Sequence, residues 1–169
     1  MTRKSVLSVN AGSSSVKLTF YTFEKTPQVI AAAQVSGITA PPAKLKYTSG
    51  STQHNEELKD SLNTPQDAFK FLLHRCISDP ELSEVASTDD LAYICHRVVH
   101  GGNYESSVVI TDETLHHLEK LEDLAPLCVR TTCHPHAIVS DTTQTQLLRA
   151  GNHPSLQKGD SIRQEHHLL

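Results

Sequence analysis

The sequence predicts an α/β domain built around a mixed β-sheet. Its first half contains several stretches of strand length with alternating apolar and polar residues, followed by one strongly periodic helix. A further strand and more strand and helix segments come next. Strands interleaved with helices favour a sheet that helices cover, and 169 residues are enough for one such domain with its own core.

Four strands are expected before the first helix. Residues 5–10 form a short, mainly apolar run, and residues 16–23 begin with apolar side chains at every second position. The small residues at 11–15 form a turn that joins these two strands as a hairpin. Residues 29–35 are the third expected strand, and residues 45–48, between Pro-containing and Gly-containing turns, form a short extra one.

The clearest helix begins after position 64. Thr64 is a good N-cap, and Pro65 suits the first helical position, where its missing N–H costs nothing. The apolar residues that follow at helical spacing are Ala68, Phe69, Leu72, Leu73, Cys76 and Ile77. Residues 91–99 then predict another strand and residues 107–110 a short one, and Thr111 caps a second helix with an acidic first turn.

The composition excludes several classes of function. With 15 Lys and Arg against 19 Asp and Glu, the formal net charge is −4, whereas a protein that mainly binds nucleic acid or an anionic membrane needs a basic face. No apolar stretch approaches the roughly 18 residues that span a bilayer. The first residues lack the apolar core of a secretory signal, so we expect a cytoplasmic protein whose four cysteines are free thiols.

A change in composition near Leu127 divides the chain. All eight aromatic residues precede position 105, and residues 128–169 contain nine Val, Ile or Leu without helical or strand periodicity. So few apolar residues cannot offset the entropy of ordering these 42 residues. The expected organisation is therefore one domain at residues 1–127, followed by an irregular or disordered tail at 128–169.

A small-residue turn near the amino end is a candidate phosphate cradle. The segment Asn10-Ala-Gly-Ser-Ser-Ser-Val-Lys17 offers the backbone N–H of Gly12, several hydroxyls and one ammonium group. It is not a Walker A loop, because Val16 stands where that motif has glycine and a strand follows in place of a helix. Asn10 could hold Mg²⁺ through its amide oxygen or a water molecule. The alternative is an ordinary serine-rich hairpin turn with a solvated lysine.

The predicted strand at 91–99 ends in an unusual cluster. His96, Arg97 and His100 lie within five residues and precede two glycines. Unpaired buried charge is costly, so this strand end suits an anion, and the Arg97 guanidinium could bind a carboxylate or transferring phosphoryl oxygens. The alternative is a strand that becomes exposed at its end and pairs with nearby acidic residues. Both motifs lie at strand ends, where open α/β sheets bind their ligands.

Together the two motifs resemble the amino-terminal part of the acetate kinase family. The resemblance covers residues 5–127 and includes residues 6–17, residues 96–102 and the Leu-Ala-Pro-Leu run that ends at Leu127. It implies a ribonuclease-H-like domain of the actin, Hsp70 and sugar kinase superfamily, in which two such domains close over a nucleotide. It also implies the conversion of ATP and acetate to ADP and acetyl phosphate, with Mg²⁺ or Mn²⁺, in a homodimer. Propionate and butyrate kinases share these motifs.

The resemblance also implies roles for individual residues. Asn10 would assist the metal ion and the phosphate. The other residues in contact with phosphate would be Gly12, Ser13, Ser15 and Lys17. Arg97 would be catalytic and would bind the acetate or acetyl phosphate end. Val99 would line the methyl pocket, and His96 and His100 would support the anionic site.

The chain departs from the family after Leu127. The family continues with a His-Asn-Pro type segment, a strand that bears a catalytic Asp and a second, nucleotide-binding domain, whereas none of these motifs occurs in residues 128–169. We therefore expect a first domain without its second domain, with a tail translated out of frame after a frameshift or a mis-spliced exon. Two other interpretations stay open: a non-catalytic half-domain that binds phosphate or acyl phosphate, and a non-functional truncation product.

Overall fold

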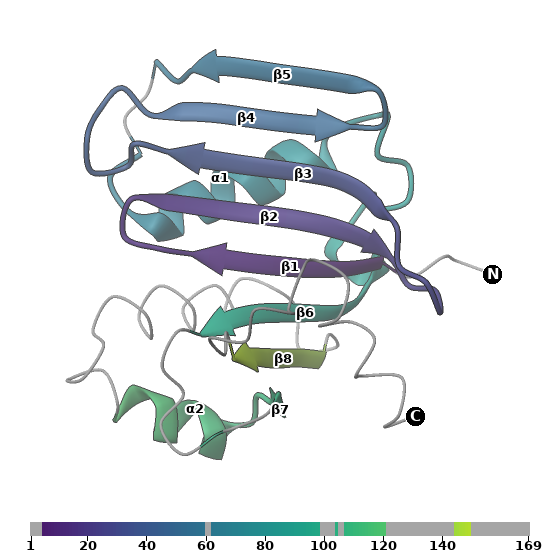
Figure 1. Ribbon diagram of the computed structural model, residues 1–169, viewed down its shortest axis with the longest axis vertical. Coiled ribbons are helices and arrows are strands. Elements are labelled where there is room, and N and C mark those ends of the chain that lie inside the picture. The colour runs from purple at the N-terminus through teal and green to yellow at the C-terminus, as the bar shows by residue number, and fades with distance from the viewer. Residues whose placement is uncertain (1–4, 60–61, 99–103, 105–106, 121–143, 150–169) are drawn as a thin grey trace.

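The computed structural model describes residues 5–59, 62–98, 104, 107–120 and 144–149, which form one β-sheet with helices beside it (Figure 1). The eight strands of this described part are hydrogen-bonded in the order β5-β4-β3-β2-β1-β6-β8-β7. Some neighbours are antiparallel and others parallel, so the predicted α/β class with a mixed sheet is confirmed. Within the same residues, no helix is long and apolar enough to cross a membrane.

The first five strands form an antiparallel meander, in which each strand pairs with the next. Their bounds are β1 Ser5–Ala11, β2 Ser15–Thr22, β3 Val29–Ser36, β4 Lys44–Ser49 and β5 Thr52–Glu57. The four strands expected from the sequence agree with β1 to β4 to within one residue at each end. β5 was not expected, because its side chains are polar and mostly exposed, so it shows no apolar alternation.

On the other side of β1 the sheet continues with β6 (Leu91–Val98), which runs parallel to β1. A short 3₁₀-helix, η1 (Thr88–Asp90), leads into this strand. β6 is the strand predicted from the sequence, and Val99, the last residue of that prediction, lies outside the described residues. The short strand expected next is also present as β7 (Val108–Val109).

One strand, β8 (Gln144–Arg149), lies in the segment for which the composition predicts an irregular tail. It pairs with β6 in parallel and with β7 in antiparallel orientation. Its two leucines are adjacent rather than alternating, so the sequence gives no strand signal, and backbone pairing with its neighbours defines the strand. The prediction is therefore wrong for these six residues. The expected domain boundary at Leu127 lies outside the described residues.

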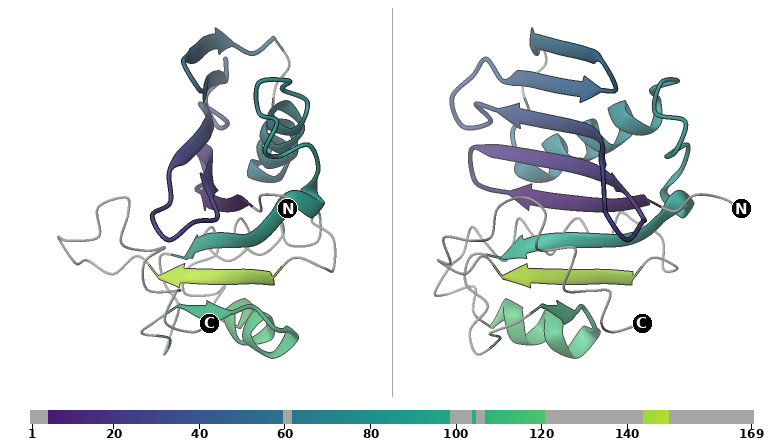
Figure 2. Two further views of the ribbon diagram at one scale, coloured as in Figure 1. Left: turned by 90° about the vertical axis from the view of Figure 1, so that its right-hand side faces the viewer. Right: turned by 45° about the vertical axis from the view of Figure 1, so that its right-hand side comes forward.

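Helix α1 (Pro65–Ile77) covers one face of the sheet, where it packs against β2 and β3 (Figure 2). Thr64 is its N-cap, as expected: the Thr64 hydroxyl accepts a hydrogen bond of 3.1 Å from the Asp67 backbone N–H. The predicted apolar stripe is the buried side of this helix. The second predicted helix is also present, as α2 (Asp112–Glu119), with Thr111 at its N-cap.

The hydrophobic core lies between α1 and the sheet. The core residues from β1 to β4 occupy alternate positions: Leu7, Val9, Ala11, Val16, Leu18, Phe20, Ala31, Ala33, Val35, Leu45 and Tyr47. Successive side chains of a strand point to opposite faces, so the residues between these positions lie on the face away from α1. Figure 2 shows α1 on one side of these strands only. Polar residues on the other face are therefore available for a site.

Candidate functional site

Three strand ends meet at one edge of the sheet. β1 ends there and β2 begins there because the two form a hairpin. β6 ends there as well because it runs parallel to β1. Figure 1 shows these ends close together on the left of the view. The two sequence motifs therefore lie at the same edge, although they are about 80 residues apart in the chain.

Asn10, Lys17 and Arg97 lie on one face of this edge. Asn10 pairs directly with Lys17 across the hairpin. Val9 pairs with His96 in the parallel register, so the next residues, Asn10 and Arg97, are neighbours. Val9 and His96 are buried on the α1 side, and alternation places the three polar side chains on the opposite face.

These three residues are close enough to share one ligand. Opposed residues on neighbouring strands have Cβ atoms about 5 Å apart, and lysine and arginine side chains reach further than that. Asn10 and Arg97 are exposed, and Lys17 is half-buried. The structure therefore brings together three of the residues that the sequence singled out, while their binding roles stay predictions.

The turn between β1 and β2 is closed by its own backbone. The Gly12 N–H donates a hydrogen bond of 2.8 Å to the Ser15 carbonyl oxygen. The expectation that this N–H is open to a phosphate is therefore wrong, because the hairpin turn uses it. Ser13 is exposed and Ser15 is half-buried, so the turn presents hydroxyl groups rather than the glycine N–H at this edge.

His96 lies on the opposite face of β6 from Arg97. Its side chain is only 2% exposed and shares the core side of the sheet with Val9. The histidine is therefore not part of the exposed face, and any influence on an anion bound there passes through the strand. Val99 and His100, the other residues expected at this strand end, lie outside the described residues.

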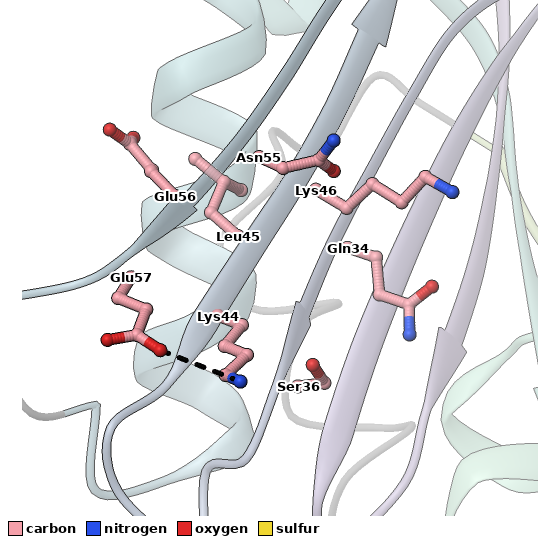
Figure 3. Close-up of a pocket in the computed structure, with 8 residues that line it drawn as sticks. All are labelled: Gln34, Ser36, Lys44, Leu45, Lys46, Asn55, Glu56 and Glu57. Atoms are coloured by element: carbon pink, nitrogen blue, oxygen red, sulfur yellow. Dashed lines mark ion pairs between the residues drawn. The ribbon is translucent and has the colours of Figure 1, made fainter.

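The same face continues its polar pattern into the outer strands. Lys17 pairs with Gln34, Gln34 with Lys46, and Lys46 with Asn55. Figure 3 shows Gln34, Lys46 and Asn55 extending to the same side of the sheet. These three residues help to line an open depression of about 380 Å³. No sequence motif marks these three residues as a site, although Gln34 and Lys46 each stand between two core residues.

The other residues that line this depression are of mixed character. Lys44 and Glu57 form an exposed ion pair of 3.5 Å at the ends of β4 and β5. Ser36, at the end of β3, lies beside Lys44. Leu45 and Glu56 point away from the side on which Lys46 lies (Figure 3). The site face therefore carries basic and amide groups together with the Glu57 carboxylate, which is paired with Lys44.

The described residues could contribute one ligand to a metal ion. No group of three or more His, Cys, Asp or Glu side chains among them could hold a metal. Asn10, exposed between Lys17 and Arg97, carries a carboxamide oxygen. Mg²⁺ often takes one or two protein ligands and otherwise keeps water and substrate phosphates. The arrangement therefore fits a metal ion that is held mainly by a phosphate ligand.

A second polar cluster joins β4 to the end of α1 on the core face. Tyr47 is 1% exposed, and its hydroxyl donates a hydrogen bond to the Asp79 carboxylate. The Arg75 guanidinium lies 5.2 Å from the centre of the Tyr47 ring. The hydrogen bond from Tyr47 lowers the pKa of Asp79, and burial raises the pKa of Tyr47. Burial also raises the pKa of the adjacent Cys76 thiol to about 12, so this cluster is structural rather than reactive.

The chain is similar to known proteins over most of its length. A family model described as the acetokinase family matches residues 5–148. A probable acetate kinase of Emericella nidulans is 70% identical over 127 residues, which are 75% of this chain and 30% of that protein. A probable acetate kinase of Neurospora crassa is 48% identical over 149 residues, which are 85% of this chain and 32% of that protein.

Solved structures of kinases have the same fold. Acetate kinase of Porphyromonas gingivalis has a TM-score of 0.71 at 26% identity, over 86% of this chain and 37% of that one. A propionate kinase of Francisella tularensis has a TM-score of 0.68 at 22% identity, over 86% of this chain and 36% of that one. The expected ribonuclease-H-like fold of the actin, Hsp70 and sugar kinase superfamily is thereby confirmed. The chain spans about a third of the length of the curated relatives it matches. Because the family match covers well over half of its residues, the chain belongs to the acetokinase family.

Proposed function

We propose that this chain forms the phosphate- and carboxylate-binding part of an acetate kinase, which transfers the terminal phosphoryl group of ATP to acetate and yields ADP and acetyl phosphate. The observation that carries the proposal is the placement of Asn10, Lys17 and Arg97 on one face, where β1, β2 and β6 meet. Membership of the acetokinase family and the names of the relatives support the same reaction.

In the proposed reaction, the main task of the protein is to neutralise the negative charge of the reacting groups rather than to form a covalent bond with them. The transferring phosphoryl group spreads negative charge over its oxygens, and the attacking carboxylate is an anion too. Lys17 would supply a point charge to the phosphate, and the planar guanidinium of Arg97 would bind the carboxylate of acetate or the acyl phosphate product. The phosphate and the carboxylate repel each other in solution. Binding both at one edge of the sheet would hold them in position for phosphoryl transfer.

Asn10 lies between the two cations, where a metal ion would be needed. Mg²⁺ or Mn²⁺, when bound, supplies positive charge to the phosphate oxygens. The Asn10 carboxamide oxygen would accept a hydrogen bond from a metal-bound water or coordinate the metal ion directly. The Asn10 NH₂ group would donate a hydrogen bond to a phosphate oxygen. The hydroxyls of Ser13 and Ser15 would add donors from the turn. These residues would fix the phosphate relative to Arg97.

The rest of the catalytic site would come from sequence outside these residues. We propose that the adenosine pocket and a catalytic Asp belong to the two thirds of the relatives that this chain does not span. Loss of one preorganised charge-stabilising group costs about two to three orders of magnitude in rate, so the isolated chain would bind phosphate without measurable turnover. The homodimer and the cytoplasmic location belong to the same proposal. Asn10, Lys17 and Arg97 would contact only the carboxylate and phosphate groups of the substrates, so they would not distinguish acetate from propionate or butyrate.

A chimera tests this proposal. Residues 1–127 would be joined to the remaining part of the Emericella nidulans relative, with which the chain shares 70% identity over 127 residues. We expect hydroxamate formation that depends on ATP and acetate from the chimera and none from the 169-residue chain. Arg97→Ala should lower the activity of the chimera at least about a hundredfold, because it removes the cation that faces the carboxylate.

Lys25→Ala is the matched control for Arg97→Ala. Lys25 is an exposed cation beyond the end of β2 that lies away from the site, so this change should leave the activity of the chimera unaltered. A folded chimera whose activity is indifferent to Arg97→Ala would exclude the anion-binding role of this residue. A normal turnover rate from the 169-residue chain alone would exclude the proposed division of the site.

A further inference from the structure

Six polar residues form a continuous row across the face of the sheet that lies away from α1. One residue comes from each of six neighbouring strands, from β6 through β1 to β5: Arg97, Asn10, Lys17, Gln34, Lys46 and Asn55. We call this set the polar row. Its members alternate strictly between a cation and a carboxamide, and it contains no carboxylate.

The spacing of the polar row suits a ligand with several negative charges. Neighbouring strands lie about 4.8 Å apart, so cations on every second strand are about 10 Å apart at their backbones. Lysine side chains are long enough for the ammonium groups of Lys17 and Lys46 to approach one another over Gln34. The Gln34 amide between them can donate to the same oxygens.

Lys46 is an exposed cation in the same depression as Glu57, a carboxylate that is paired with another lysine. No described carboxylate forms an ion pair with Lys46, whereas the neighbouring Lys44 is paired with Glu57 at 3.5 Å. Glu56 points away from the side on which Lys46 lies (Figure 3). The depression of about 380 Å³ lined by Gln34, Lys46 and Asn55 leaves room for a group of phosphate size. An exposed cation beside two amide donors in an open depression is therefore available to an anion.

We propose that Lys46 and Gln34 form a second phosphate subsite next to Lys17, so that a chain of phosphate groups binds along the polar row. The first phosphate would bind Lys17, so this part of the proposal rests on the proposed function. The second phosphate would bind Gln34 and Lys46 on the outer strands. The ligand class is a molecule with two or more linked phosphates, either an inorganic chain or the phosphate chain of a nucleotide. Lys46 thus determines preference for linked phosphates over a single phosphate.

Calorimetric titration of the 169-residue chain tests the subsite. Inorganic tripolyphosphate, inorganic phosphate and ATP would each be titrated into the unaltered chain and into Lys46→Gln. We expect Lys46→Gln to weaken tripolyphosphate binding about fivefold, the effect of one solvent-exposed charge-assisted contact, and to change phosphate binding by less than about twofold. Lys46→Arg should retain most of the affinity, and Gln34→Leu should lower it. Lys25→Gln removes the same charge away from the row and should have no effect on any of the three ligands.

The outcomes separate the subsite from the proposed function. A loss with tripolyphosphate alone identifies an inorganic chain as the ligand, and an equal loss with ATP identifies the phosphate chain of a nucleotide. The proposal is overturned if Lys46→Gln and Lys25→Gln behave alike, or if the unaltered chain binds tripolyphosphate no more tightly than phosphate. Lys17→Gln tests the proposed function separately, because it removes the first phosphate contact and should weaken all three ligands.

Discussion

Replacing Tyr47 with phenylalanine tests how β4 is held to α1. The change removes one hydroxyl, which donates its hydrogen bond to Asp79, and leaves the buried ring in place. The guanidinium of Arg75, 5.2 Å from the ring centre, still lies over an aromatic face in the variant. The perturbation is therefore limited to the contact between the hydroxyl and the carboxylate.

The expected loss of stability is about 1 to 1.5 kcal/mol. A hydrogen bond to a charged group contributes about 1.5–3 kcal/mol when its removal leaves the charge buried and unsatisfied. Asp79 is only half-buried and also accepts a hydrogen bond of 2.9 Å from the Glu81 backbone N–H, so water can replace the lost donor. The cost should lie at or slightly below the lower end of that range.

The loss should also depend on pH, with a definite sign. The hydrogen bond from Tyr47 is the largest cause that lowers the pKa of Asp79 below its ordinary 3.8. A lowered pKa stabilises the folded state above the ordinary pKa, and this contribution disappears as the pH falls through the pKa of the folded state. The difference between the unaltered chain and Tyr47→Phe should therefore be full at pH 7 and shrink below about pH 4.

Urea unfolding followed by circular dichroism, from pH 7 down to pH 3, measures both effects. Tyr93→Phe is the control, because the structure shows no hydrogen bond between the Tyr93 hydroxyl and another described residue, and its loss should be below about 0.5 kcal/mol. Equal losses for the two variants at pH 7 would refute the contribution of the hydrogen bond. A loss for Tyr47→Phe that is the same at pH 7 and pH 3 would refute its coupling to Asp79.

Three further predictions concern the cap of α1, two glycines and the reading frame after Leu127. Thr64→Ala should lower the free energy of unfolding by about 1 kcal/mol, because the N-cap of α1 is lost, whereas Thr64→Ser should cost little in the same urea titration. Gly37→Ala should cost about 2 kcal/mol, since its φ is 77° and an added Cβ would lie 3.1 Å from the Pro42 carbonyl oxygen. Gly50→Ala has open space at a φ of 53°, so it should cost only about 1 kcal/mol, and equal losses would contradict the steric argument. Genomic sequencing should find, in another frame after the Leu127 codon, a continuation that encodes the family's Asp-bearing strand, and its absence from all frames would exclude a frameshift.

Much of the fold could be predicted from local patterns. The alternation in β2 and β3, the capped start of α1 at Thr64 and the apolar stripe of that helix each report burial on one side of one element. β5 shows no apolar alternation in the sequence, because it is a polar edge strand held by backbone pairing to β4. β8 likewise depends on a partner that is about 50 residues away in the sequence.

The sequence could predict the position of some residues of the candidate site but not of others. The pairing of Asn10 with Lys17 follows from the hairpin turn between them, so both could be assigned to one place from the sequence. The position of Arg97 depends on the register of a parallel pair that no local pattern specifies. A shift of one residue in that register would exchange the faces of His96 and Arg97, so the sequence could group the two residues but could not say which one faces the ligand.

The alternation in β4 makes stability and binding separable at neighbouring residues. Tyr47 lies in the core and is held by Asp79 and Arg75, whereas the preceding Lys46 lies on the face away from α1. Tyr47→Phe acts on the equilibrium between folded and unfolded chain, so under conditions where the variant stays folded it should leave the affinity for tripolyphosphate unchanged. Lys46→Gln removes an exposed charge that no described residue pairs with, so it should change that affinity and leave the urea midpoint within error. If Tyr47→Phe instead weakens tripolyphosphate binding in the folded chain, the hydrogen bond from Tyr47 to Asp79 also sets the position of Lys46, and the two faces of β4 are coupled.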